Sequence, residues 1–324
     1  MKKYDGNEVA MAGKKRRRQT KKRTRGGWIA LKIIFALVAA LGMVFGYAAL
    51  NANTVHVRYA EVTLKDLPQA FDGCRVLFVS DIDLCGINTP EKAAKLFKRL
   101  KDLRPDVLLL GGDYTSNSVI DILNQSENSA ESVQQRAVFL RGIADFEAPL
   151  GKFAVAGDDD ADVEGLMLLM EETGIEPLFN GHAAVKKDGD ALHIVGFNAN
   201  TTGVNFNKVA NAFSKKDCVI ALTHSPSAFP QMLTAEAKDS GAWADLMLAG
   251  HTHGGQIRLG DRNIIRLSGQ ELDFLYGWKR ESETIMLTTS GLGCEGTNLR
   301  LGTESEVWLI TLSDGSVNLP DLST

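Results

Sequence analysis

Short apolar runs alternate with amphipathic segments along most of this chain. The apolar runs, typical of buried strands, cover 76–79, 106–110, 152–156, 218–222 and 245–249. Thr89-Pro90-Glu91 is a typical helix start, and the apolar spacing after it predicts a helix over 90–103. Further helices are expected near 131–144, 161–173 and 205–215. Strands that alternate with helices favour an α/β fold that places ligands at the carboxyl ends of its strands.

The remaining segments complete this pattern. Strands are expected near 184–186 and 191–196, and the polar stretch 116–129 is expected to be a loop. Residues 284–289 and 306–312 read as consecutive strands without a long helix between them. The chain shows no internal repeat, and we expect a single domain over 55–324.

The N-terminal part has a different composition. Residues 1–27 hold eleven Lys and Arg against Asp5 and Glu8, whereas the whole chain has a net charge of -4. The next segment, 28–50, is apolar except for Lys32 and is long enough to cross a bilayer as a helix. The positive-inside rule then predicts a cytoplasmic tail at 1–27, a retained transmembrane anchor at 28–50 and an extracytoplasmic body.

Other interpretations of this region are open. Residues 28–50 could be a cleaved signal peptide or a buried core helix, although the segment exceeds the usual apolar length of a signal peptide. A basic run can also bind nucleic acid. Because the run has a simpler role in setting membrane topology, we expect no nucleic-acid partner.

The four cysteines show no CxxC spacing, so neither a zinc ribbon nor a thioredoxin motif is indicated. Cys74 and Cys218 lie in strand-like runs and are expected to be buried. Cys85 and Cys294 lie in glycine-containing loops, where a disulfide is conceivable in an extracytoplasmic domain. The sequence leaves that question open.

Five apolar runs end at side chains that bind metals. The residues at these ends are Asp81, Asp113, Asp158, His224 and the pair His251 and His253. Carboxylate oxygens and imidazole nitrogens are common ligands of divalent cations. The glycines around the two histidines permit close approach of the backbone. The sequence therefore predicts one metal centre built from several strand ends.

These blocks resemble a known signature. Five blocks of the chain are similar to the five signature blocks of calcineurin-like metallophosphoesterases: Asp81-Ile82-Asp83, Gly112-Asp113, Gly157-Asp158-Asp159-Asp160, His224 and Gly250-His251-Thr252-His253. The resemblance spans about 74–312. It is greatest to a membrane-tethered bacterial branch, which Tyr276-Gly277-Trp278, Ser290-Gly291-Leu292-Gly293 and Arg300 also resemble. It implies a two-sheet β-sandwich flanked by helices and preceded by one transmembrane helix.

The resemblance also implies a ligand set and an activity. Members of the family hold two divalent metal ions and hydrolyse phosphomonoesters or phosphodiesters. The first ion would be held by Asp81, Asp83, Asp113 and His253. The second would be held by Asp113 as the bridge, Asp158, His224 and His251. Asp159, Asp160 and Arg300 are the candidate catalytic residues.

Three positions depart from the family pattern. Aspartate replaces the usual histidine at 83, asparagine at 158 and histidine at 159. The four ligand carboxylates would bring two divalent ions to neutrality, which makes the site less attractive to an anionic phosphoester. Oxygen ligands favour harder ions, so among Mn, Mg, Fe, Ca and Zn we expect the harder ones. At pH 7 an Asp159 with an ordinary pKa would repel an oxyanion.

Two functions follow from these observations. The first is a membrane-anchored phosphoesterase, on the outer side of the cell membrane, that acts on a phosphoester which is lipid-linked or nucleotide-linked. The second is a catalytically impaired relative, in which the metal pocket binds a ligand or a partner without turnover.

Overall fold

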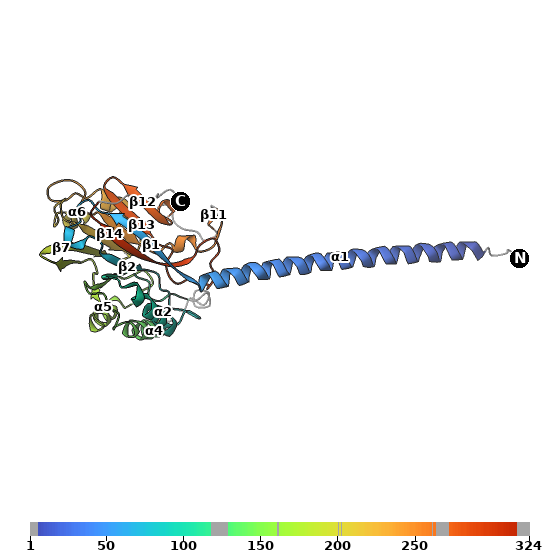
Figure 1. The fold of residues 1–324 in the computed structure, drawn as a ribbon. Coiled ribbons are helices and arrows are strands. Elements are labelled where there is room, and N and C mark those ends of the chain that lie inside the picture. Colours follow the sequence, from blue (N-terminus) through green and yellow to red (C-terminus); the bar gives the residue numbers. More distant parts are fainter. Residues whose placement is uncertain are drawn as a thin grey trace. The chain divides into compact units, whose positions relative to one another are not determined.

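The computed structural model describes residues 6–117, 129–160, 162–199, 201, 203–260, 262–263 and 272–315. The chain divides into two compact units, Met1–Ala48 and Ala49–Thr324. The first consists of helix α1 (Gly6–Ala52), whose last residues belong to the second unit (Figure 1). Within α1, Gly26–Ala52 has a mean hydropathy of 2.4 and is long and apolar enough to cross a membrane, by length and composition alone.

The second unit contains two six-stranded mixed sheets. The first has the order β1 (Val55–Thr63), β14 (Ser305–Ser313), β2 (Arg75–Val79), β3 (Val107–Leu110), β4 (Lys152–Ala154) and β5 (Glu176–Pro177). The second has the order β12 (Gly277–Glu281), β13 (Thr284–Thr288), β9 (Leu246–Ala249), β8 (Val219–Thr223), β7 (Asp190–Phe197) and β6 (His182–Lys187). A small hairpin joins β10 (Arg258–Leu259) to β11 (Arg262–Asn263).

The core lies in layers between and outside the sheets. Alternate strand residues face opposite sides of a sheet. Val76 and Phe78 of β2 belong to a cluster that includes Ile220 and Leu248 of the other sheet. Leu77 belongs to a second cluster under the helices α2 (Pro90–Leu100), α4 (Ser129–Gly142) and α5 (Val163–Glu172). A third cluster packs α6 (Phe206–Ala210) and α7 (Phe229–Leu233) on the second sheet. The predicted two-sheet sandwich flanked by helices is thus confirmed (Figure 1).

Local signals explain where several elements begin. The Thr89 hydroxyl accepts the Lys92 N–H and Pro90 occupies the first turn of α2, as expected for a capped helix start. The end of the predicted helix 90–103 is a separate 3₁₀ turn, Lys101–Leu103. Other 3₁₀ turns are Gln69–Phe71, Pro226–Ala228 and His253–Gly255.

Some elements differ from the sequence predictions. The predicted helix 205–215 is shorter and ends at Ala210, and β1 and β12 were not predicted. β1 pairs in parallel with β14, with Val55 opposite Ser305. This edge strand has mostly half-buried residues, so its sequence lacks the continuous apolar run of the central strands. Most of the predicted loop 116–129 lies outside the described residues.

Candidate metal centre

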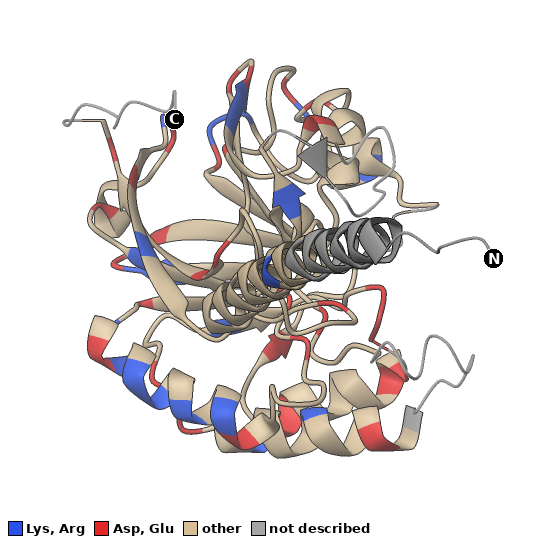
Figure 2. Ribbon diagram, turned by 90° about the vertical axis from the view of Figure 1, so that its right-hand side faces the viewer, with Lys and Arg blue, Asp and Glu red and all other residues tan. Residues whose placement is uncertain are grey.

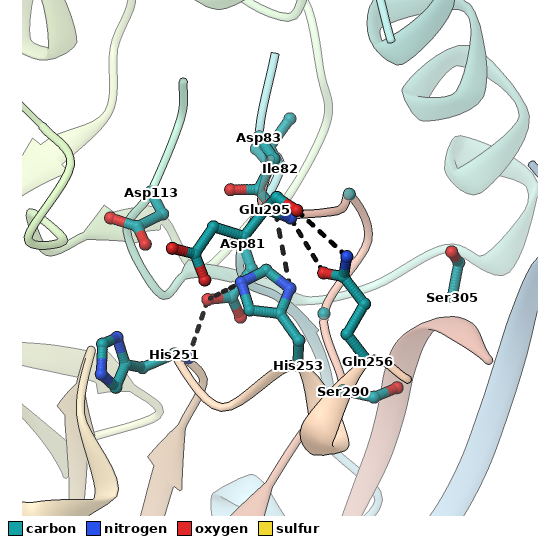
Figure 3. Close-up of polar contacts among 12 residues, drawn as sticks. Asp81, Ile82, Asp83, Asp113, His251, His253, Gln256, Ser290, Glu295 and Ser305 are labelled. Carbon is teal, nitrogen blue, oxygen red and sulfur yellow. Dashed lines mark hydrogen bonds and ion pairs between the residues drawn. The ribbon is translucent and has the colours of Figure 1, made fainter. Parts of the chain in front are cut away.

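Neighbouring parallel strands deliver the predicted ligands to one edge. β2, β3 and β4 pair in parallel in the first sheet, and β8 and β9 pair in parallel in the second. Their carboxyl ends therefore lie together at one edge of each sheet. Figure 3 shows side chains from both sheets converging there, among them Asp81, Asp113, His251 and His253.

Four residues form a tight cluster. Asp113, Asp158, His224 and His251 each offer one ligand atom, and these atoms all lie within 4.8 Å of one another. His224 Nε2 lies 3.1 Å from Asp113 Oδ2 and 2.8 Å from Asp158 Oδ1. His251 Nδ1 lies 3.0 Å from Asp158 Oδ1. The other ring nitrogen of His224, Nδ1, contacts the Gly111 carbonyl at 2.8 Å, which orients the ring toward the cluster.

A second group lies deeper and contains polar atoms without partners. His253 Nδ1 lies 3.6 Å from Asp83 Oδ2, and His253 Nε2 lies 4.0 Å from Asp81 Oδ1. Four side-chain atoms here are buried and have no hydrogen-bond partner among the described residues: Asp81 Oδ2, both carboxylate oxygens of Asp83, and His253 Nδ1. Buried polar atoms without partners are costly. A cation between them would remove that cost, so these residues fit the implied first metal.

The backbone is left-handed at five of the seven predicted ligands. The φ values are 53° at Asp81, 49° at Asp83, 51° at Asp113, 71° at His251 and 50° at His253. Positive φ is uncommon outside glycine, is tolerated best by Asp, Asn and His, and gathers at functional sites. The left-handed backbone at these five positions is thus typical of a functional site.

Two glycines permit the close packing. A β-carbon on Gly157 would lie 1.9 Å from Asp113 Oδ1, and one on Gly250 would lie 2.3 Å from Asp81 Oδ2. Both distances are far below van der Waals contact, so any larger residue would displace a predicted ligand. The glycines next to the ligand blocks are therefore steric requirements of the site.

The crowding of carboxylates shifts their pKa values. Burial, together with repulsion from Asp81 and Asp113, raises the pKa of Asp83 well above its ordinary value. Burial and repulsion from Asp113 raise the pKa of Asp81 to about 6. Burial opposes ionisation of Asp158 as well, but hydrogen bonds from His224 and His251 outweigh it and hold the pKa of Asp158 well below its ordinary value.

Asp159 and Glu295 add negative charge beside the cluster. Burial, then repulsion from Asp113 and Asp158, raises the pKa of Asp159 to about 7. Glu295 was not predicted from the sequence, because it follows no strand. Its side chain points toward the site in Figure 3, and burial and repulsion from Asp113 raise its pKa. The only sequence signal for Glu295 was its position just after the 290–293 block.

Asp160 faces the main chain of two loops. Its carboxylate accepts the N–H groups of Asp113 at 3.0 Å, Tyr114 at 3.0 Å and Gly157 at 2.7 Å. These bonds tie the segment after β3 to the segment after β4. Asp160 is thus placed to position Asp113, while its predicted catalytic role stays a prediction.

The Arg300 side chain also forms hydrogen bonds with the main chain. The side chain is fully buried, and its guanidinium donates to the carbonyls of Gly293 at 2.6 Å, Ser290 at 2.6 Å and Glu304 at 3.0 Å. A further bond reaches the His253 carbonyl at 3.4 Å. These contacts are those of a residue that holds loops around the site, and contact with substrate stays a prediction.

None of the four cysteines forms a disulfide in the described part of the chain. Cys74, Cys218 and Cys294 are buried, and Cys85 is half-buried. The structure therefore contains no disulfide between Cys85 and Cys294.

Comparison with known proteins is consistent with this site. The family model for calcineurin-like phosphoesterases matches residues 74–255, which is more than half of the chain. The chain belongs to the calcineurin-like phosphoesterase family, as the sequence blocks predicted.

Individual proteins resemble this chain at low sequence identity. A transmembrane protein with metallophosphoesterase domain from Danio rerio is 29% identical over 86% of this chain. The chain spans only 61% of that protein's length. The metallophosphoesterase YkoQ of Bacillus subtilis is 26% identical over 85% of this chain and 97% of its own. Among solved structures, a dimetal phosphatase from Danio rerio is 9% identical, with a TM-score of 0.38 over 68% of this chain and 88% of its own.

Proposed function

We propose that this chain is a phosphoesterase that uses two divalent cations. The first would be held by Asp81, Asp83, Asp113 and His253, and the second by Asp113, Asp158, His224 and His251. The family match supports a phosphoester substrate. The observation that carries the proposal is the cluster of four ligand atoms within 4.8 Å, beside buried carboxylate oxygens that lack partners.

When bound, the cations would acidify a water molecule and stabilise charge on the phosphoryl oxygens. The chain's own residues prepare the site for them. Asp113 is the proposed bridge: its Oδ1 accepts the Asp159 N–H at 3.0 Å, and its Oδ2 faces His224. This leaves the carboxylate fixed in orientation. The excess of oxygen ligands favours Mn, Mg, Fe or Ca over Zn.

Asp159 is the proposed proton donor to the leaving group. It occupies the position of the family's catalytic histidine and is half-buried beside the cluster. A protonated carboxyl group there would act as a general acid, whereas an ionised one would repel the substrate.

The crowding of acidic side chains at the metal centre supports a second candidate function. Asp159 and Glu295 place two more acidic groups beside ligands that already neutralise two cations. Such a site attracts a phosphoester weakly. The alternative is a metal-containing module that binds a ligand or a partner without turnover.

We also propose that residues 28–50 anchor the body to the cell membrane, with 1–27 in the cytoplasm and 55–324 outside. The apolar stretch of α1 and the basic residues before it support this topology, and so does the description of the Danio rerio relative as a transmembrane protein. A tethered body would reach phosphoesters at the membrane surface. Lipid-linked and nucleotide-linked phosphoesters are therefore the proposed substrate class.

The two functions are separated by measurements on the purified full chain. Bound metal is quantified by elemental analysis, and hydrolysis of phosphomonoesters and phosphodiesters is screened with Mn²⁺, Mg²⁺, Ca²⁺ and Zn²⁺. Metal-dependent turnover is expected. Bound metal without turnover would favour the binding module, and a chain that binds no metal would contradict both.

A further inference from the structure

The Ala49–Thr324 unit contains a cavity of about 500 Å³ between the start of β1, helix α2 and the 292–298 loop. We call it the β1–α2 pocket. Its lining includes Ala52, Asn53, Val57, Lys95, Leu96 and Arg99. None of the predicted metal ligands belongs to the lining, so the pocket is separate from the metal centre.

The pocket lies where the chain leaves the proposed anchor. Ala52 is two residues beyond Leu50 and both belong to α1, so at about 1.5 Å per helical residue the lining begins roughly 3 Å along the helix from the anchor's end. The Asn51 side chain donates to the Thr303 carbonyl at 2.5 Å, which ties this exit point to the body. Lys92 Nζ donates to Asn53 Oδ1 at 2.6 Å and ties the same point to α2. If residues 28–50 cross the membrane, the lining therefore begins two residues beyond the span.

The lining combines an apolar wall with a basic rim. Val57 and Leu96 contribute to the wall. Lys92, Lys95 and Arg99 follow one another along α2 at helical spacing, so they lie on one face of the helix. Figure 2 shows that Lys and Arg recur along the helical layer.

The rim has cations available for a ligand. Among the residues that the structure describes, the Lys95 and Arg99 side chains make no hydrogen bond or ion pair, and Asp102 is the one acidic residue of the lining. The rim therefore carries a net positive charge. An amphipathic cavity with available cations fits an amphipathic anion.

We propose that the β1–α2 pocket binds the head group of an anionic phospholipid from the leaflet next to the body. The phosphate charge would pair with Lys95 and Arg99, and the glycerol and first acyl carbons would contact the wall at Val57 and Leu96. Free phosphate would leave that apolar wall without a partner. The proposal rests on residues 28–50 crossing the membrane, and it does not depend on whether the metal centre turns over substrate.

The test measures lipid retention by the full chain. Protein purified in a neutral detergent is mixed with equal amounts of phosphatidylglycerol and phosphatidylcholine, and the retained lipids are counted by native mass spectrometry. We expect preferential retention of phosphatidylglycerol. Lys95→Gln with Arg99→Gln should lower that preference by roughly ten-fold, because each basic residue near an anionic lipid contributes measurably to binding.

A matched control removes the same charge from the same segment. Lys98→Gln with Lys101→Gln changes two residues outside the pocket lining, and the preference should be retained. Leu96→Glu places a negative charge in the wall and should lower the preference without removing a cation. Thermal unfolding verifies that each variant is folded.

Two results would overturn the proposal. One is equal retention of both lipids by the unmodified chain. The other is an equal loss of preference in the Lys98 and Lys101 control, which would indicate diffuse attraction to positive charge. Hydrolysis of a soluble aryl phosphoester is measured on the same variants and should not change. A failure of the lipid proposal is thereby distinguished from a failure of the proposed catalysis.

Discussion

The main-chain N–H of Asp113 donates a hydrogen bond of 3.0 Å to the carboxylate of Asp160. The same carboxylate accepts the N–H of Gly157, whose missing β-carbon lets Asp113 approach. One buried acid thus fixes the distance between the two loops that carry Asp113 and Asp158. Asp113 is the proposed bridge between the cations, so its position is decisive for both.

Asp160→Ala should therefore lower both stability and metal content. Three buried N–H groups would lose their acceptor, and we expect the free energy of unfolding to fall by about 2–4 kcal/mol. Asp160→Asn keeps one acceptor oxygen and should have a smaller effect. Thermal unfolding and metal content per folded molecule measure the two effects. Asp190→Ala, an exposed change in β7, is the control and should change neither. Unchanged metal content in folded Asp160→Ala would contradict the positioning role.

The metal-free protein should become less stable as the pH rises from about 4 to 9. Asp81 has a folded pKa of about 6 and Asp160 of about 7, both above the ordinary aspartate value, and His251 has a folded pKa of about 9, above the ordinary histidine value. The stability that these groups contribute is fully present below their ordinary pKa and is lost as the pH rises through the folded pKa.

Two histidines, His253 and His193, act in the opposite direction, because burial lowers the pKa of each. Burial and the charge of Arg300 hold the pKa of His253 well below its ordinary value, so His253 favours the folded state increasingly up to about pH 6.5. The decline should therefore be clearest between pH 6.5 and 9. Chemical denaturation across this range, with and without Mn²⁺, measures it, and bound metal should flatten the curve. A metal-free protein whose stability rises over pH 6.5–9 would contradict these shifts.

Metal binding should require the two histidines after β9. His251→Ala with His253→Ala removes one ligand from each proposed cation site, so nearly all bound metal should be lost. The melting temperature should fall, because a ligand that binds only the folded state stabilises it. Elemental analysis and calorimetry measure the two effects. His182→Ala, an exposed strand residue, is the matched control. Full metal content in the double variant would show that the ligand assignment is wrong.

Restoring the family pattern should raise hydrolysis. Asp83→His, Asp158→Asn and Asp159→His together remove three carboxylates and return an imidazole beside the leaving group. Loss of a general acid typically costs roughly 10²–10⁴-fold in rate, so we expect a gain of roughly ten-fold or more on an aryl phosphoester, with a shift toward Zn²⁺.

The single change Asp159→Asn separates charge from proton donation. It should relieve repulsion without providing an acid, and it should gain less than the triple variant. A triple variant that binds metal and gains nothing, while the unmodified chain hydrolyses a phosphoester well, would show that the aspartate-rich site is a working variant. No hydrolysis by either metal-loaded form would favour the binding module.

The proposed topology predicts a defined pattern of proteolysis. Protease added to intact cells or protoplasts should digest the body after Asn51 and spare residues 1–27. Antibodies against tags at each end can follow both parts, and lysed cells serve as the control in which both are digested. Protection of the body in intact cells would place it on the cytoplasmic side.

Part of the site and of the fold could be predicted from the sequence. Six of the predicted ligands follow the end of an apolar run: Asp81, Asp113, Asp158, His224, His251 and His253. Parallel strands bring their carboxyl ends to one edge of a sheet, so the convergence of these residues was predictable. Helix α2 was predictable from its cap and its apolar spacing. β1 was not, because an edge strand with half-buried residues lacks a continuous apolar run and its partner β14 lies about 250 residues away in the chain.

Sequence alone determined the α/β alternation and the strand ends that carry the ligand side chains, because hydrophobic periodicity and ligand chemistry are local properties. The family and its two-sheet architecture came from the resemblance of the five blocks. Only the tertiary structure decided which way each acidic side chain turns. It directed Asp160 to three main-chain N–H groups, enclosed Arg300 among carbonyls and brought Glu295 toward the cations' proposed site. Those roles depend on the packing together of loops that are distant in the sequence.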